Sequence, residues 1–494
     1  MNKINRVVIA GGGTAGWMAA AAMAKVLGKA VDIQLVESDV IGTVGVGEAT
    51  IPTLLTYNRL LGINEREFMA ATQATFKLGI EFENWKEKNH SYIHAFGITG
   101  KDHWTAGFQH FWRRGLDVGC ASDYGEYCLE LSAAQKGRFA HLNENGLNYA
   151  YHLDASLYAK FLRTMAEAHG AKRIEGKIVD VTQNGESGYV TALTLDDGRV
   201  VEGDLFVDCS GFRGLLIEET LHTGYEDWTH WLPCDSAIAV QTESVSEPIP
   251  YTRSIAHDSG WQWRIPLQHR TGNGLVFCSR YQSDDDAIKT LMDNIEGKPL
   301  VDPRVLKFRT GTRRKHWNRN VVSLGLASGF IEPLESTSIH LIQRGILRLM
   351  RMFPSDGVKQ SDIDEFNAQT KFETDGVRDF IILHYHVTDR RDTPFWRQCA
   401  GMDIPDSLQH RIDLFRETGR VFKMSDELFA ENSWTQVMLG QGIMPEGHHP
   451  VADVMSEEEL ARFLDHVKTN VERAASSLPT HQQYIERYCK AAAM

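Results

Sequence analysis

The 494-residue sequence predicts an α/β fold in which a parallel-sheet core is joined to an antiparallel sheet lobe and a mostly helical C-terminal lobe. The N-terminus has the order strand, glycine turn, helix, strand. Short alternating apolar runs fill residues 228–281, which is typical of antiparallel strands. Past about residue 340, apolar residues recur at helical spacing. We therefore expect a first domain over residues 1–340 and a helical lobe over residues 341–494.

The N-terminal segment predicts a dinucleotide site. An apolar strand over residues 6–10 is followed by Gly11-Gly12-Gly13-Thr14-Ala15-Gly16, a helix and a second strand over residues 31–36 that ends at Glu37. Glycines let the backbone close on a pyrophosphate, the helix N-terminus offers free N–H groups, and the later acid takes a ribose hydroxyl pair. The expected core is therefore of the Rossmann type, with these cofactor-binding residues: Gly11, Gly13, Thr14, Ala15, Gly16 and Glu37.

Two later segments agree with this core. Residues 204–211 and 321–330 each read as a strand that enters a turn of small or polar residues. They match the places where flavoprotein folds bring the chain back beside FAD. We expect Gly325 and Ser328 to lie at the cofactor.

Composition narrows the class of protein. Lys plus Arg is 52 and Asp plus Glu is 65, so the net charge is −13, and without a basic run nucleic acid is not an expected partner. The sequence has neither a run of eighteen apolar residues nor a secretory signal, so we expect a cytoplasmic protein that does not enter a membrane. Its seven cysteines contain no CxxC pair and are expected to be reduced thiols, and no set of metal ligands is predicted.

Three motifs carry possible chemistry, and each has a plainer interpretation. Lys77 lies among apolar neighbours, as a strong buried donor would, or it is a lysine extending to solvent from an amphipathic helix. Trp261 and Trp263 precede Ile265-Pro266 and could form a wall, although two indoles at strand spacing also fit core packing. Glu335, in a Pro-Leu-Glu-Ser-Thr run, is a candidate acid-base group or a surface carboxylate beside a proline turn.

Together these motifs resemble the flavin-dependent halogenases of the tryptophan halogenase family, from the N-terminal fingerprint to at least residues 392–396. The resemblance implies FAD used as FADH2, with O2 and chloride or bromide. A flavin C4a-hydroperoxide and the halide would give hypohalous acid, which would halogenate an indole or another electron-rich aromatic ring. Because no second nucleotide fingerprint for NADH is present, a separate NADH-dependent flavin reductase is the expected partner.

The resemblance also assigns roles. Lys77 would hold the hypohalous acid by a hydrogen bond or as a haloamine, and Glu335 would face the substrate. Thr337 and Ser338 would bind the halide; many relatives have glycine where this chain has Ser338, which makes the halide geometry an open question. A strap over residues 45–52 would contact the flavin through Gly47, Glu48, Ala49 and Thr50. The expected substrate pocket is Ile51, Pro52, Ile80, His94, Phe96 and Trp434, and the wall beside the flavin is Trp261, Trp263, Ile265 and Pro266.

One segment departs from the family pattern. Residues 432–442 lack the paired tyrosines with which enzymes acting on free tryptophan hold its amino-acid group. Indole, or an indole or phenol within a larger molecule, is therefore the expected substrate. A hydroxylating flavin monooxygenase and a non-catalytic flavin-binding scaffold are the alternatives. The native substrate, ring position, preferred halide and oligomeric state, a homodimer included, stay open.

Overall fold

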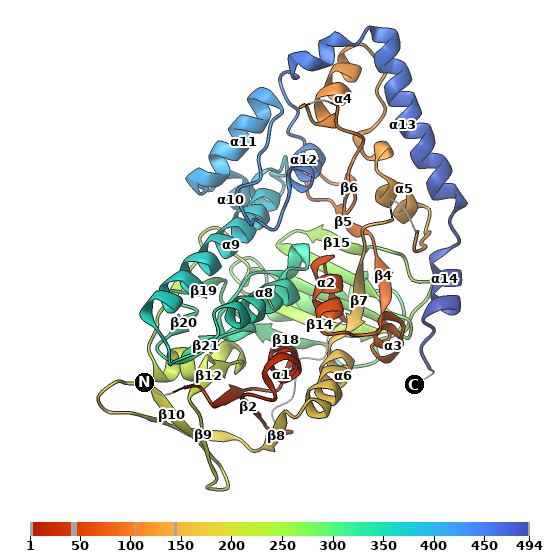
Figure 1. Cartoon of the computed structure of the whole chain (residues 1–494). Helices are drawn as coiled ribbons and strands as arrows, with labels where there is room; N and C mark the ends of the chain where they lie inside the picture. The colour runs from red at the N-terminus through yellow and green to blue at the C-terminus, as the bar shows by residue number, and fades with distance from the viewer. Residues whose placement is uncertain (1–2, 41–46, 104, 143–145, 493–494) are drawn as a thin grey trace. The chain divides into compact units, whose positions relative to one another are not determined.

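The computed structural model (Figure 1) describes residues 3–40, 47–103, 105–142 and 146–492. The chain divides into two compact units. The first unit is made of residues 1–74, 153–229 and 308–374; the second is made of residues 75–152, 230–307 and 375–494. The boundary predicted near residue 340 stays a prediction; residues 340 and 341 both lie in α8 (Ser338–Arg351) of the first unit.

The first unit is built on the predicted Rossmann-type sheet. Its six strands have the order β20 (Trp317–Asn318), β21 (Val321–Ser323), β12 (Leu205–Asp208), β1 (Arg6–Ala10), β2 (Asp32–Glu37) and β8 (Lys172–Glu175). All neighbours are parallel except β20 and β21. Ile9 lies between Leu35 and Val207 in this register, and all three are fully buried. Buried apolar runs of this kind are typical of a parallel sheet covered by helices.

Helices and small sheets complete the first unit. Helix α1 (Thr14–Leu27) has a buried run of alanines, which favour helix, and contacts α6 (Ala155–Ala168) and α8 (Figure 1). Two further α-helices of this unit are α2 (Thr53–Leu60) and α3 (Glu65–Ala71). Short strands are β3 (Gly47–Ala49), the sheet β11 (Val200–Glu202), β10 (Val190–Leu195) and β9 (Ile178–Gln183), and the sheet β13 (Tyr225–Asp227), β19 (Gly311–Arg313) and β22 (Gly329–Phe330).

The second unit contains the predicted antiparallel sheet. Its seven strands have the order β18 (Arg304–Lys307), β14 (Ser236–Thr242), β17 (Thr271–Phe277), β16 (Gly260–Pro266), β15 (Thr252–His257), β5 (Gly79–Glu83) and β6 (Ser91–Ala95). The β15–β5 pair alone is parallel among these neighbours, and β5 and β6 come from an earlier part of the chain than the other five strands. A separate pair, β4 (Thr75–Lys77) and β7 (Ala150–Asp154), is antiparallel.

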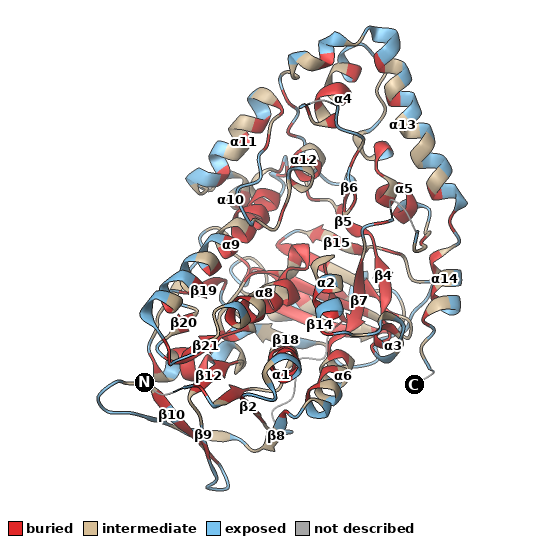
Figure 2. Cartoon of the chain, in the orientation of Figure 1, coloured by how far each residue is buried: buried red, intermediate tan, exposed pale blue. Residues whose placement is uncertain are grey.

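The C-terminal part is helical, as predicted. Helix α9 (Gln360–His386) begins in the first unit and ends in the second. The other helices of the second unit are α4 (Phe108–Asp117), α5 (Leu129–Gln135), α7 (Asp284–Asn294), α10 (Pro394–Gly401), α11 (Asp406–Thr418), α12 (Glu431–Gly440), α13 (Glu457–Ser477) and α14 (His481–Tyr488). The capping box predicted for α13 is present, with Ser456 and Glu459 satisfying each other's backbone N–H groups. Helices α11 and α13 keep exposed faces (Figure 2).

All seven cysteines are free thiols. Within the described ranges, none of the helices combines the length and the apolar character needed to cross a membrane.

Candidate active site

The glycine turn after β1 has the shape that a dinucleotide requires. Gly11 has a φ of +113°, and a Cβ there would lie 2.3 Å from the carbonyl oxygen of Cys209, so the position needs glycine. Gly13 precedes α1 without a side-chain cap, and no described atom lies within 4 Å of the Cβ it lacks. The first N–H groups of α1 are therefore left for an anion such as a pyrophosphate.

Glu37 lies against this turn. A Cβ on Gly12 would lie 1.5 Å from Glu37 Oε2, and the same oxygen accepts a hydrogen bond from Trp17 Nε1 at 3.3 Å. The other oxygen pairs with Arg173. A carboxylate offers about four lone-pair positions, so Glu37 keeps the capacity to accept hydroxyl groups. These residues fit the adenosine half of FAD.

The strap (residues 45–52) and the predicted cofactor segment over residues 321–330 both belong to the first unit. Gly45 and Val46 fall outside the described residues, whereas β3 and the buried Thr50 and Ile51 continue the chain into Pro52 and α2. Burial raises the pKa of Glu48 to about 7, so its carboxyl is partly protonated near neutral pH.

The segment after β21 returns to the start of α1. Gly325 has a φ of +63°, and a Cβ there would lie 2.9 Å from Ala15 Cβ. Ser328 Oγ donates to the carbonyl of Gly325 at 2.7 Å and fixes the turn. The structure therefore brings the predicted residues Ala15, Gly325 and Ser328 to one place.

The predicted halide site lies at the start of α8. Glu335 and Thr337 are fully buried, and Ser336 between them has a φ of +59°. Thr337 caps α8 without a side-chain hydrogen bond, and its buried Oγ1 has no hydrogen-bond partner among the described residues. Ser338 is the first helical residue and has no positive φ, so this position does not need glycine. Free N–H groups and a free hydroxyl at a helix N-terminus suit a small anion.

In the second unit, Lys77 is fully buried at the end of β4. Its Nζ lies 5.2 Å from the centroid of the Phe96 ring, within cation–π range. Lys77 is on a strand, so the alternative of a lysine reaching solvent from an amphipathic helix is wrong. Ile80, also fully buried, lies opposite His94 in the β5–β6 pair.

An aromatic cluster surrounds His94 and includes the predicted Trp434. The rings of Phe380 and Phe429 stack at 3.7 Å, and Phe380 meets Trp434 edge-on at 4.7 Å. His94 lies 5.7 Å from Phe380. Trp434 Nε1 is buried without a hydrogen-bond partner in the described part of the chain, and Arg411 covers the ring at 4.2 Å. Two of the predicted pocket residues thus meet in one cluster rich in aromatic surface.

The Trp-x-Trp-x-Ile-Pro run forms β16. Trp261 is buried, with its ring 6.1 Å from Trp263 and 6.4 Å from Trp85. Trp263 lies across Gly274, where a Cβ would be 1.9 Å from Cζ2. Trp261 thus packs in the core of its unit, and a wall beside the flavin stays a prediction for this run.

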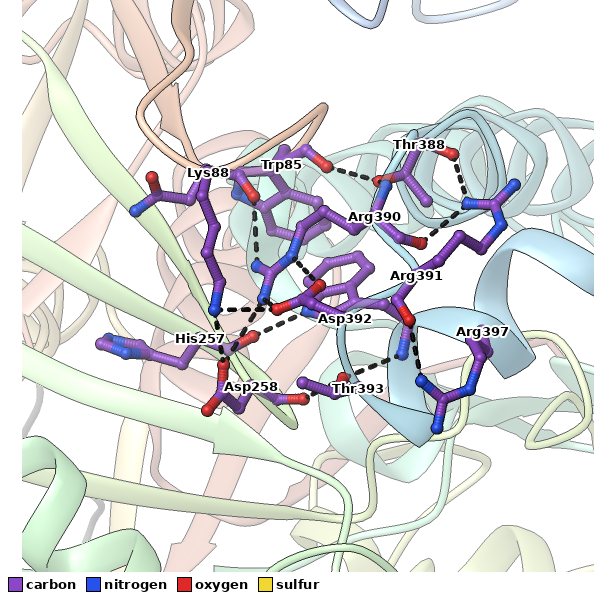
Figure 3. Close-up of polar contacts among 12 residues, drawn as sticks. Trp85, Lys88, His257, Asp258, Thr388, Arg390, Arg391, Asp392, Thr393 and Arg397 are labelled. Atoms are coloured by element: carbon purple, nitrogen blue, oxygen red, sulfur yellow. Dashed lines mark hydrogen bonds and ion pairs between the residues drawn. The ribbon is translucent and has the colours of Figure 1, made fainter.

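A polar network fixes the turn that precedes β16 (Figure 3). The guanidinium of Arg390 lies 4.6 Å over Trp396, whose Nε1 donates to the carbonyl of His257 at 2.8 Å. Arg390 also pairs with Asp392 at 3.0 Å and holds the pKa of that carboxyl well below its usual range. Lys88 reaches the same carboxylate at 2.9 Å (Figure 3). The segment after α9 is therefore tied to the β15–β16 turn.

Comparison with known proteins matches residues 6–457 to the family described as tryptophan halogenase. The chain belongs to the tryptophan halogenase family. It is 33% identical to tryptophan 7-halogenase RebH of Lentzea aerocolonigenes, over 98% of this chain and 99% of RebH. Among solved structures it is similar to Xcc4156, a flavin-dependent halogenase from Xanthomonas campestris (60% identity, TM-score 0.98, 100% of both chains). BrvH, a flavin-dependent halogenase from Brevundimonas sp. BAL3, is 46% identical with a TM-score of 0.95, over 98% of this chain and 99% of BrvH.

The protein is therefore a flavin-dependent halogenase, and the hydroxylase alternative is not favoured. Sequence reasoning missed several residues that support its candidate site. In the first unit, Glu373 of α9 contacts His340 at 3.4 Å and pairs with Arg344 and Arg348 at 2.7 Å each. His340 Nδ1 in turn lies 3.0 Å from Thr53 Oγ1, just past the strap. These contacts hold α8 in place. The helix begins at Ser338, which belongs to the predicted halide site.

Two amides of α12 were also missed. Asn432 Nδ2 donates to the carbonyl of Gly97 at 2.6 Å, and Asn432 Oδ1 accepts from the backbone of Thr99 at 3.0 Å. Gln436 accepts from the backbone of Ala95 at 2.9 Å and donates back to it at 3.2 Å. Their helical spacing of four was the available signal, but it could not name a partner more than 300 residues away.

Proposed function

We propose that this halogenase chlorinates or brominates indole, or an indole or phenol within a larger molecule, using Lys77 and Glu335. The observation that carries the proposal is the buried ammonium of Lys77 beside the Phe96 ring. A buried lysine amine is a strong donor and can hold and polarise a small neutral oxidant. Glu335, which is also buried, balances the positive charge of the ring intermediate or takes up the proton that leaves it.

The glycine turn, Glu37, the strap and the Gly325–Ser328 turn would hold FAD. Reduced by a separate NADH-dependent reductase, the bound FAD would supply hypohalous acid from O2 and halide. Thr337 and Ser338 bind the chloride or bromide at the start of α8, where the free hydroxyl and N–H groups favour an anion. Water is kept from Lys77 by the complete burial of its side chain.

The substrate class is inferred from α12. Asn432 and Gln436 use their amides on the backbone of residues 95–99, which contains Phe96, so they are committed within the protein and do not hold a substrate's amino-acid group. Trp434 lies between them on the same helix and contributes aromatic surface. An aromatic ring without an amino-acid group suits this arrangement better than free tryptophan does.

The test is incubation with FAD, an NADH-dependent flavin reductase, O2, bromide and indole, followed by mass spectrometry. Bromoindole, recognised by the isotope doublet of bromine, is the expected product, and indole is expected to have a higher kcat/KM than free tryptophan. Hydroxyindole formed equally well without bromide would contradict halogenation by this chain. A preference for free tryptophan would contradict the substrate class alone.

A further inference from the structure

A chain of hydrogen bonds joins β4, β7, β15 and β16 in the second unit. Thr75 and His152 are directly opposite in the β4–β7 pair, with 3.1 Å between Thr75 Oγ1 and His152 Nδ1. Thr75 Oγ1 donates to the carbonyl of Pro266 at 2.8 Å, and His152 Nε2 lies 2.9 Å from Thr252 Oγ1. All four residues are buried. We call Thr252, His152, Thr75 and Pro266 the His152 relay.

The position of each proton in the relay follows from its ends. A carbonyl can only accept, so the single proton of Thr75 points to Pro266. Thr75 Oγ1 must then accept from His152 Nδ1–H. Burial lowers the pKa of His152 well below its ordinary value, and the nearby Lys77 amine lowers it further, so the imidazole is neutral. Its Nε2 is therefore an acceptor for the hydroxyl of Thr252.

The relay lies on the same face of β4 as Lys77. Side chains two residues apart on a strand share a face, so Thr75 and Lys77 point the same way. Pro266 ends β16, the strand of Trp261 and Trp263. Strand β4 has three residues, and the relay adds side-chain hydrogen bonds to the backbone pairing with β7 that holds the lysine in place.

The other side of β4 has its own support. The backbone N–H of Phe76 donates to His481 Nε2 of α14 at 3.1 Å, and His481 Nδ1 donates to the carbonyl of Pro248 at 2.7 Å. The Phe76 ring stacks on Phe139 at 4.0 Å. Held on both sides, β4 leaves its last side chain little freedom.

We propose that Thr75 and His152 are positioning residues for halogenation, which act by holding β4 so that the Lys77 amine stays fixed beside Phe96. The inference rests on the proposed role of Lys77. The neutral relay has a second consequence: it orients β4 without placing another positive charge beside the ammonium. An ion pair in the same position would either repel the amine or attract it away from the oxidant.

The primary test is the matched pair Thr75→Val and Thr75→Ser. Valine keeps the shape but removes both hydrogen bonds, whereas serine keeps them. The ratio of bromoindole formed to O2 consumed is expected to fall about 10- to 100-fold in Thr75→Val, because a displacement near 1 Å has effects of this size. Serine is expected to stay within about twofold of the natural protein, since the hydroxyl geometry is kept. O2 consumption, FAD affinity and the KM for indole should not change in either variant.

A readout without flavin is the position of the amine. In a crystal structure of Thr75→Val without FAD, Lys77 Nζ is expected to leave its place 5.2 Å from the Phe96 centroid. In the complete reaction of Thr75→Val, the amount of halogenated scavenger of hypohalous acid should rise by as much as the amount of bromoindole falls. An unmoved amine together with an unchanged product ratio would overturn the proposal.

A second pair of variants, at His152, tests the relay if Thr75→Val does not fold. In His152→Asn the amide can still donate to Thr75, whereas His152→Gln reaches only toward Thr252. Asparagine should keep more of the product ratio than glutamine, and the reverse order would overturn the relay. Lys77→Met separates the two proposals. If Lys77→Met still halogenates, the role of Lys77 is wrong; if it does not while Thr75→Val is normal, only the relay is wrong.

Discussion

Two buried histidines, one in each unit, hold the elements that carry the predicted site, and they do so by different physics. His340 lies between Thr53 and Glu373, and the carboxylate of Glu373 also forms ion pairs with Arg344 and Arg348. The ring nitrogens of His152 lie instead at hydrogen-bond distance from the hydroxyls of two threonines. A charged cluster holds α8, at whose start the halide site is predicted, whereas a neutral relay holds β4, which carries Lys77. The comparison shows that a buried histidine can be part of two kinds of support, one built on ion pairs and one built on hydrogen bonds between uncharged groups.

The largest effect should come from breaking the charged cluster. Glu373→Ala leaves Arg348 buried without its carboxylate, which is expected to lower the free energy of unfolding by about 3–5 kcal/mol. Glu373→Gln, which keeps the shape and some hydrogen bonds, should lose less. Urea unfolding followed by circular dichroism measures both. If the alanine variant lost under about 1 kcal/mol, the cluster would behave like an exposed ion pair.

The pH dependence of stability should differ between the two histidine networks. Burial acts to raise the pKa of Glu373, but His340 and Arg348 outweigh it and lower the pKa from 4.5 to about 2. A lowered pKa in the folded state gives stabilisation that is present above pH 4.5 and lost as the pH falls toward 2. Its size is on the order of 3 kcal/mol for a shift of this extent.

The measurement is the free energy of unfolding from pH 6 to pH 2 for the natural protein and for Glu373→Gln. The difference between the two should shrink steadily below pH 4.5. A difference that stays constant over this range would show that the carboxylate is not stabilised by its neighbours.

The relay should give a smaller effect without this pH dependence. Thr252→Val leaves Nε2 of the neutral His152 without its donor, which is expected to lower the free energy of unfolding by about 1–3 kcal/mol. Because His152 is neutral well below its ordinary pKa, the loss should be equal at pH 8 and pH 6. Urea unfolding at the two pH values checks this, and a loss that differs between them would mean that the ring is charged in the relay.

The sequence was sufficient for the elements with local signals. The glycine turn with Glu37 and the capping box of Ser456 and Glu459 each depend on spacings of a few residues or one βαβ unit, and both are confirmed. The addition of β5 and β6 to the antiparallel sheet could not be predicted, because their partner β15 lies far along the chain. The His152 relay was hidden for the same reason: Thr75 and Pro266 are 191 residues apart.

For the candidate site, the residue types in the sequence indicated which side chains could act, but not which residues would contact one another. Lys77 among apolar residues indicated a buried amine, which is confirmed, whereas nothing local predicted that Phe96 would lie beside it. Trp261 could not be assigned to wall or core by spacing, since both uses place an indole on a sheet face. The roles of Lys77, Glu335 and the halide site stay predictions.

The most direct test of the central claim is the amount of bromoindole formed per O2 consumed by Lys77→Met, a variant of similar length without the charge. FAD affinity and O2 consumption are expected to be unchanged, and the amount of bromoindole is expected to fall by about 10²- to 10⁴-fold, the usual range for loss of a positioned proton donor. Bromoindole formed at the rate of the natural protein would contradict a catalytic role for the buried amine.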